Sequence, residues 1–296
     1  MNVCSEPPPQ GGSGACSAPV GPSGRIRLAL EVAYDGAAFR GFAENTGVTT
    51  VAGELRAALE RTLRQPLELT CAGRTDAGVH GRGQVVTFDV DPTGLRGDLD
   101  DARLRNAINS QLAPQVVVRE VNRVGPDFDA RFSATWRLYR YSVLNSPVPD
   151  PFLARTAWWV TDPLDRDALA SATFALVGQH DFSSFCRRPR GADEVSLVRR
   201  VLHARWTDRD DGMLCLEIAG SSFCHQMVRS IVGTVVDVGR GRRSAEDVPA
   251  ILAARDRNAA SNVAPPQGLC LWQVGYDAWP VGADLLGGPP DGDDIC

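Results

Sequence analysis

The stretch CAGRTDAGVHGRGQVVTFD, residues 71–89, carries more information than any other part of this chain. One acidic residue, Asp76, stands in a loop made almost entirely of glycine, arginine and small residues. Glycine adopts backbone conformations closed to other residues and lets a ligand approach the main chain closely. The glycines are Gly73, Gly78, Gly81 and Gly83, and the arginines, which can bind phosphate, are Arg74 and Arg82. A strand-like run, 84–90, would hold this loop in place, so the loop can present one carboxylate to an anionic polymer.

A structural role for Asp76 is the alternative. Aspartate is common in tight turns, where its side chain accepts hydrogen bonds from nearby backbone amides. The spacing of the residues leaves both interpretations open.

A resemblance to a known family favours the catalytic interpretation. The segment GRTDAGVHGRGQVV resembles the signature loop of the TruA family of tRNA pseudouridine synthases. The resemblance implies that Asp76 is the catalytic residue. It also implies that Arg74 helps to flip the target nucleotide out of its stack, a movement that chemistry on a base in a stem requires.

The segment ARFSATWRLYRYSVLN, residues 130–145, is a second match to that family. Tyr139 and Tyr141 are two residues apart, so on a strand they share one face. By itself such a tyrosine is typical of a core aromatic residue. The resemblance implies that Tyr139 stacks on the flipped uracil, as aromatic rings do with unstacked bases.

The segment SSFCHQMVRSIVGTVVDVG, residues 221–239, is the third match. On a predicted helix over 222–238, His225, Arg229, Gly233 and Asp237 are spaced by four and form one stripe. An arginine on a face that also carries a glycine can lie close to a neighbouring element. The resemblance implies that Arg229 pairs with Asp76 and keeps it ionised. Pairing of Arg229 with Asp237 or solvent is the alternative, and we interpret His225 as structural.

Weaker matches extend the resemblance over about residues 25–280. Residues 32–42 resemble the family's opening strand and turn, and 265–277 resemble its closing segment. The family's usual tryptophan and glutamines are replaced by the run Phe42-Ala43-Glu44-Asn45, which leaves RNA contacts by this loop open.

Composition limits the class of protein. The chain has 296 residues, 43% hydrophobic and 23% charged, which is typical of a globular protein of one large or two medium domains. It has no apolar run of about twenty residues and no secretory signal, so we expect a cytoplasmic protein with no membrane span. The net charge is −5, yet all 31 basic residues are arginine, and they cluster at 187–190, 199–200 and 240–243. A local basic surface is compatible with a negative total.

The eight cysteines predict neither a metal site nor disulfides. They form no Cys-X-X-Cys pair, which zinc sites usually contain, and a long chain without a secretory signal gives little reason to expect disulfides. We expect most of them to be small core residues or exposed thiols.

Hydrophobic periodicity predicts an α+β protein. Alternating apolar residues predict strands, and apolar residues spaced by three or four predict helices. The predicted strands are 26–34, 67–70, 84–90, 116–118, 136–144, 198–207, 213–219 and 269–276. The predicted helices are 55–63, 164–177, 222–238 and 244–254. A further predicted helix carries Leu104 and Ile108 and begins after an N-cap at Asp98. These elements fit two ferredoxin-like α/β domains that share an extended, mostly antiparallel sheet, the pseudouridine synthase fold. The predicted division is a disordered tail 1–24, an N-terminal domain 25–128, a C-terminal domain 129–281 and a disordered tail 282–296.

The resemblance as a whole implies isomerisation of uridine to pseudouridine at positions 38–40 in the anticodon stem-loop of tRNA. It implies a homodimer, and the reaction needs neither a cofactor nor a metal. Two alternatives are a noncatalytic RNA-binding protein of the same fold and a glycoside-cleaving hydrolase. The second usually needs two carboxylates, and this loop supplies one.

Overall fold

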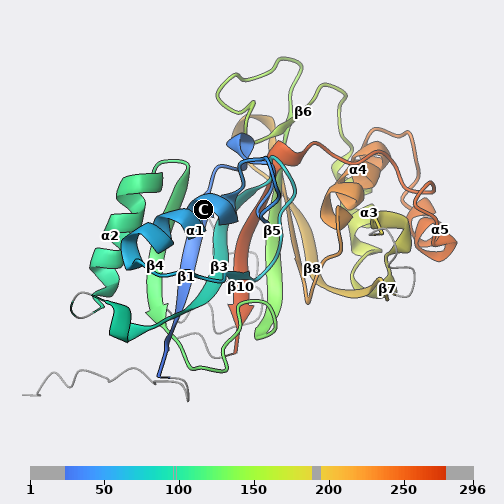
Figure 1. The fold of residues 1–296 in the computed structure, drawn as a ribbon. Coiled ribbons are helices and arrows are strands. Elements are labelled where there is room, and N and C mark those ends of the chain that lie inside the picture. The colour runs from blue at the N-terminus through green and yellow to red at the C-terminus, as the bar shows by residue number, and fades with distance from the viewer. Residues whose placement is uncertain (1–23, 96, 98, 189–194, 278–296) are drawn as a thin grey trace, which may run out of the picture.

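The computed structural model describes residues 24–95, 97, 99–188 and 195–277. Within these residues, ten strands form one sheet and five α-helices pack against it (Figure 1). The predicted disordered tails lie outside the described residues, apart from Gly24. No helix of the described ranges is long and apolar enough to cross a membrane.

The elements follow the predicted alternation of strands and helices. The strands are β1 (Ile26–Tyr34), β2 (Thr70–Cys71), β3 (His80–Val90), β4 (Val116–Arg123), β5 (Ala134–Asn145), β6 (Trp158–Val160), β7 (Gly178–Asp181), β8 (Val198–Asp208), β9 (Met213–Gly220) and β10 (Leu269–Tyr276). The helices are α1 (Val51–Leu63), α2 (Asp101–Leu112), α3 (Arg166–Phe174), α4 (Met227–Gly239) and α5 (Asp247–Ala254).

One sheet runs through the whole molecule. Its strand order is β4-β1-β3-β10-β5-β9-β8-β7, with β2 paired to β3 and β6 to β5. The C-terminal strand β10 pairs in parallel with β3, with Leu271 opposite Gly81, and in antiparallel fashion with β5. Strand β10 therefore joins the strands of the N-terminal half to those of the C-terminal half. The strand order confirms the predicted α+β class with an extended, mostly antiparallel sheet.

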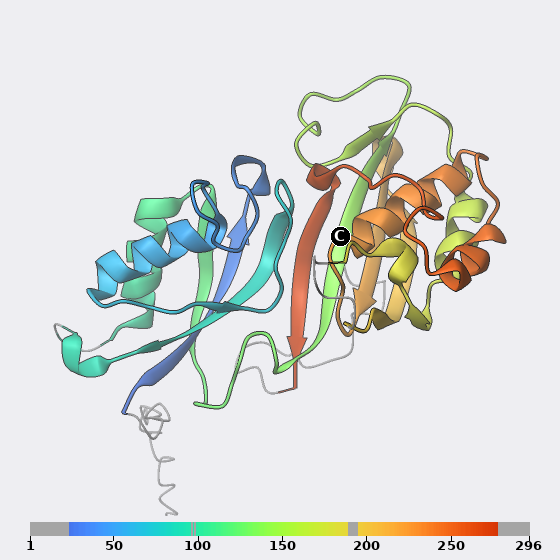
Figure 2. The same cartoon turned by 45° about the vertical axis from the view of Figure 1, so that its right-hand side comes forward.

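Two hydrophobic cores lie along this sheet. In the first, Leu28 and Leu30 of β1 pack with Leu55 of α1 and Ile108 of α2. In the second, the buried faces of β5, β9 and β10 pack against α3, α4 and α5. Figure 2 shows α1 and α2 over one end of the sheet and α3, α4 and α5 over the other. Burial of the apolar side chains in these two cores supplies the main driving force for folding into this arrangement.

All five helices start at other residues than predicted, and the starts of α2 and α4 have clear physical causes. The N-cap of α2 is Asp100, whose carboxylate accepts a hydrogen bond of 2.8 Å from Arg103 N, whereas Asp98 lies outside the described residues. Helix α4 begins at Met227 rather than at residue 222, because Gln226 has a left-handed backbone (φ 64°) that a right-handed helix cannot contain. His225 therefore lies in a loop and outside the helical stripe.

The expectation of free thiols is wrong for one pair of cysteines. Cys186 and Cys224 form a disulfide, with 5.8 Å between their Cα atoms. The bridge ties the segment after β7 to the loop that leads into α4. Sequence spacing gave no sign of it, because 38 residues separate the two cysteines and only the fold brings them together.

Candidate active site

The loop between β2 and β3 carries Asp76 and is held by its neighbours on several sides. The hydroxyls of Tyr34 and Thr75 lie 2.8 Å apart in a buried hydrogen bond. The amide of Phe42 donates to Thr75 O at 3.1 Å, and the side chain of Gln84 donates to Gly73 O at 2.6 Å. These bonds attach the loop to β1, to the loop after β1 and to β3, so the backbone around Asp76 is fixed before any ligand binds.

The glycines of this loop serve two different needs. Gly78 has φ of 78°, a conformation that favours glycine. Gly81 has no such backbone, but a Cβ there would lie 2.5 Å from the ring of Tyr34. Close packing, rather than backbone freedom, therefore explains Gly81.

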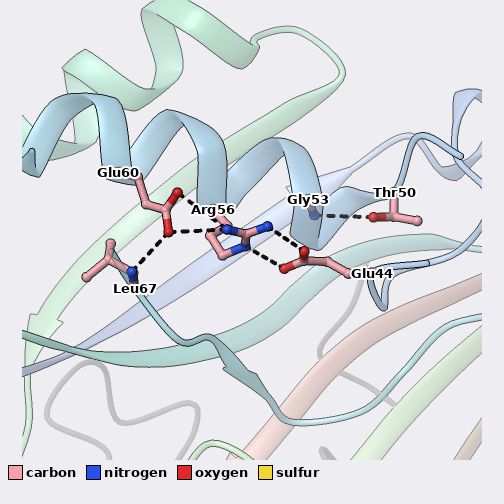
Figure 3. A network of polar contacts seen from close by, with 6 residues as sticks. All are labelled: Glu44, Thr50, Gly53, Arg56, Glu60 and Leu67. Carbon is pink, nitrogen blue, oxygen red and sulfur yellow. Dashed lines mark hydrogen bonds and ion pairs between the residues drawn. The ribbon is translucent and has the colours of Figure 1, made fainter. Parts of the chain in front are cut away.

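A polar network pins the loop that precedes α1 (Figure 3). Arg56 makes two bonds of 2.7 Å to Glu44 and a further contact of 3.2 Å to Glu60. Thr50 caps the helix by accepting a hydrogen bond of 3.3 Å from Gly53 N. In the run Phe42-Ala43-Glu44-Asn45, Phe42 is buried and Glu44 is paired within the protein, so both have structural partners here.

Asp76 lies beside the start of α4. Its Oδ2 atom is 2.9 Å from an η-nitrogen of Arg229, and this is the ion pair that the resemblance implies. The Asp76 side chain is 21% exposed and that of Arg229 is 13% exposed. A carboxylate that is paired with a cation and still reaches solvent is available to a ligand.

A segment after α5 holds Arg229 in its orientation. The Nε atom of Arg229 donates to Ala264 O at 2.8 Å, and Ala264 N donates to Arg229 O at 3.0 Å. One turn along α4, a Cβ on Gly233 would overlap with Asn262 O. The expected close approach of another element to the glycine face of this helix is confirmed.

Replacing Gly233 with alanine is expected to destabilise the fold. Alanine favours a helix interior by about 1 kcal/mol over glycine. A Cβ at residue 233 would overlap with the Asn262 carbonyl, so α4 and the segment after α5 would have to move apart. This cost outweighs the gain in helix propensity, and we expect a net loss of about 3 kcal/mol in the free energy of unfolding.

Denaturant unfolding measures this loss. Gly125→Ala is the matched control, since a Cβ there meets no atom within 4 Å, and it should change stability by less than about 0.5 kcal/mol. Equal stability of the two variants would contradict the close approach at Gly233.

His225 is a neighbour of Asp76 that the sequence analysis left out. Its Nε2 atom lies 3.4 Å from Asp76 Oδ1, and its side chain is 45% exposed. The helical stripe could not reveal this contact, because His225 is placed by the loop before α4.

Tyr139 lies on β5 beside the loop that carries Asp76. Its ring packs edge-on against Phe223, with 5.2 Å between centroids, and a Cβ on Gly73 would lie 3.9 Å from its hydroxyl. Burial raises the pKa of Tyr139, whose exposed fraction is 8%. Tyr139 and Tyr141 contribute to the same core, which confirms that they share one face of the strand. Stacking on a base stays a prediction.

Arg74 lies on the exposed side of the same loop, two residues before Asp76. Among the described residues it forms no ion pair, unlike Arg229. The structure thus brings Asp76, Arg229 and Tyr139 together and leaves Arg74 facing solvent.

Arg137 is a second residue that sequence analysis missed. Its guanidinium donates to four backbone carbonyls at 2.8 to 3.1 Å: those of Ala72, Arg131, Ala134 and Ser221. It thereby joins the loop that carries Asp76 to the segment before α4. Burial lowers the pKa of Arg137. The signal was present, since an arginine on the inward face of a strand needs buried partners.

Metal ligands do not gather at this site. Across the part of the chain that the structure describes, no three His, Cys, Asp or Glu side chains cluster in a way that could hold a metal ion.

Comparison with known proteins identifies the family. A family model described as tRNA pseudouridine synthase matches residues 31–133 and 172–277, which include the loop that carries Asp76 and helix α4. The chain belongs to the tRNA pseudouridine synthase family. It is therefore an isomerase that converts uridine in tRNA into pseudouridine.

Individual relatives agree along nearly their whole length. The tRNA pseudouridine synthase A of Brevibacillus brevis is 40% identical over 250 residues, covering 84% of this chain and 99% of the relative. That of Halalkalibacterium halodurans is 43% identical, covering 82% and 90%. That of Streptomyces avermitilis is 38% identical, covering 86% and 90%.

Proposed function

We propose that this enzyme isomerises uridines at positions 38–40 in the anticodon stem-loop of tRNA, with Asp76 as the catalytic carboxylate. The observation that carries the proposal is the Asp76–Arg229 pair, which holds a partly exposed carboxylate in a loop of the family's type. A tRNA-modifying enzyme works where tRNA is used, and on that ground we propose a cytoplasmic location.

The reaction defines what Asp76 has to do. The bond between N1 of uracil and C1′ of ribose breaks, the base turns, and a bond forms from C5 to C1′. C5 then loses its proton and N1 gains one, so the product is an isomer and no electrons are exchanged. A carboxylate next to the sugar can act as a nucleophile or as a base in such a sequence. Arg229 would keep Asp76 charged and oriented for either role.

Two more residues have proposed roles in binding the nucleotide. Arg74, exposed beside Asp76, would hold the flipped nucleotide or fill its place in the stack. Tyr139 would stack on the extracted uracil, as aromatic rings do with unstacked bases.

The wider RNA surface would come from exposed arginines and from a second subunit. Arg187 is exposed, and its backbone amide donates to His225 O at 3.0 Å, so this cation lies close to the site. We propose a homodimer with the tRNA lying across both subunits. The boundary between domains 25–128 and 129–281 is part of the same proposal.

Mapping of pseudouridine in an unmodified tRNA transcript tests the substrate. Carbodiimide labelling and primer extension should give stops confined to positions 38–40, and a transcript with cytidine at those positions should give none. Stops elsewhere would contradict the proposed site. No stops with tRNA bound would favour a noncatalytic RNA-binding protein, and release of free uracil would favour a hydrolase.

A further inference from the structure

Both oxygens of the Asp76 carboxylate face a nitrogen-bearing side chain. Arg229 lies 2.9 Å from Oδ2, and Nε2 of His225 lies 3.4 Å from Oδ1. The two neighbours differ in exposure, because Arg229 is 13% exposed and His225 is 45% exposed. Arg229 thus meets the carboxylate from the protein interior, and His225 meets it from the open side, where a substrate enters.

The backbone of His225 is fixed on both sides. The preceding residue, Cys224, is bridged to Cys186, and His225 O accepts a hydrogen bond of 3.0 Å from Arg187 N. The following residue, Gln226, has φ of 64°, which turns the chain into α4. A non-glycine residue in this conformation costs free energy and persists where the surrounding structure requires it. Together these features direct the imidazole towards Asp76.

Two of the three other histidines, His80 and His180, show what a structural role is like in this chain. His80 Nε2 lies 2.9 Å from Arg155 O, and His180 Nε2 lies 3.1 Å from Val177 O. Each of these two rings contacts a backbone carbonyl, and Nδ1 of His80 also lies 3.2 Å from Asp35 Oδ1. The ring of His225 differs in that the carboxylate it faces is that of Asp76.

We propose that His225 is a positioning residue for the reaction and acts through Asp76. A contact with Arg229 alone leaves the carboxylate free to rotate about its last side-chain bond. A second donor, at Oδ1, fixes the plane of the carboxylate and therefore the direction of the lone pair that meets the sugar. Catalytic hydrogen bonds are often long in the free enzyme and shorten when substrate binds. The inference rests on the proposed role of Asp76.

Three substitutions of His225 separate positioning from a structural role. In His225→Gln the amide nitrogen reaches the place of Nε2, whereas in His225→Asn the shorter amide takes the place of Nδ1 and does not reach Asp76. His225→Ala removes the donor. Single-turnover rates with saturating enzyme, tRNA dissociation constants and thermal midpoints are measured for each variant.

The Asn and Ala variants should lose about tenfold in rate, the effect of one hydrogen bond to a charged group, and Gln should stay within about twofold of wild type. Binding of tRNA and the thermal midpoint should not change. Equal losses in all three variants with a lowered midpoint would show a structural role and overturn the proposal. Unchanged rates, or weakened binding with an unchanged rate, would also overturn it.

Asp76→Asn, assayed in parallel, distinguishes failure of the positioning role of His225 from failure of the proposed catalytic role of Asp76. If Asp76→Asn is inactive and the His225 variants behave like wild type, the positioning role alone is wrong. If Asp76→Asn is active, the catalytic role of Asp76 itself is wrong.

Discussion

Asp76→Asn is expected to lower the rate of pseudouridine formation by about 10³-fold or more, as losses of a central catalytic group do. Asparagine has the same shape as aspartate, but it carries no charge and is neither a nucleophile nor a base of useful strength. Binding of tRNA should stay within about twofold, because most of the affinity for RNA comes from phosphate contacts made elsewhere. Tritium release from tRNA labelled at C5 of uridine measures the rate, since C5 loses its proton in the reaction.

Asp162→Asn is the matched control for this prediction. Asp162 is also a carboxylate paired with arginine, lying 3.1 Å from both Arg240 and Arg242. These partners lie at and beyond the C-terminal end of α4, whereas Arg229 lies in the first turn of that helix. The control should retain wild-type rates. Similar losses in both variants would show that the assay reports general damage rather than the chemistry of Asp76.

Arg229→Ala should lower the rate by about 10²-fold, the size of effect seen when a reacting group is displaced by about 1 Å. The substitution removes the cation that faces Asp76 and the donor to Ala264 O. Because it leaves a partly buried carboxylate and a carbonyl without their partner, the free energy of unfolding should also fall by about 2 kcal/mol. Single-turnover assays and denaturant unfolding measure the two effects.

Two further variants sharpen the test of Arg229. Arg229→Lys keeps the charge, but a single ammonium cannot reproduce the planar guanidinium that serves Asp76 and Ala264 together, so an intermediate rate is expected. Arg242→Ala, which removes an exposed arginine paired with Asp162, should leave rate and stability near wild type. A wild-type rate in Arg229→Ala would show that the ion pair is not needed for catalysis.

The fold was largely predictable because its signals are local. Strands β1 and β10 have the predicted bounds. Large apolar residues alternate along β1, and in β10 they recur on either side of a register shift between Leu271 and Gln273. The parallel pairing of β10 with β3 was not predictable from such patterns, because it joins segments nearly 200 residues apart and depends on the whole sheet. The disulfide between Cys186 and Cys224 was missed for the same reason.

The candidate site was predicted in part, and its omissions have physical causes. The Asp76–Arg229 contact followed from the resemblance, and the expected close approach at Gly233 from a glycine on the same helical face. His225 was set aside because a structural role is the more common one for a histidine, and no pattern announces the left-handed backbone at Gln226 that places His225 in a loop. Arg137 was passed over because its place on the inward face of a strand indicates only that it needs buried partners, and those partners are backbone carbonyls that no motif marks.

Nucleoside analysis of tRNA after incubation with the wild-type enzyme and with Asp76→Asn tests the central claim most directly. The account predicts that the wild-type enzyme replaces uridine with an equal amount of pseudouridine and frees no uracil. It predicts that the Asp76→Asn enzyme binds the same tRNA and yields no pseudouridine. Pseudouridine formed by the variant at the wild-type rate, or uracil freed by the wild-type enzyme, would contradict it.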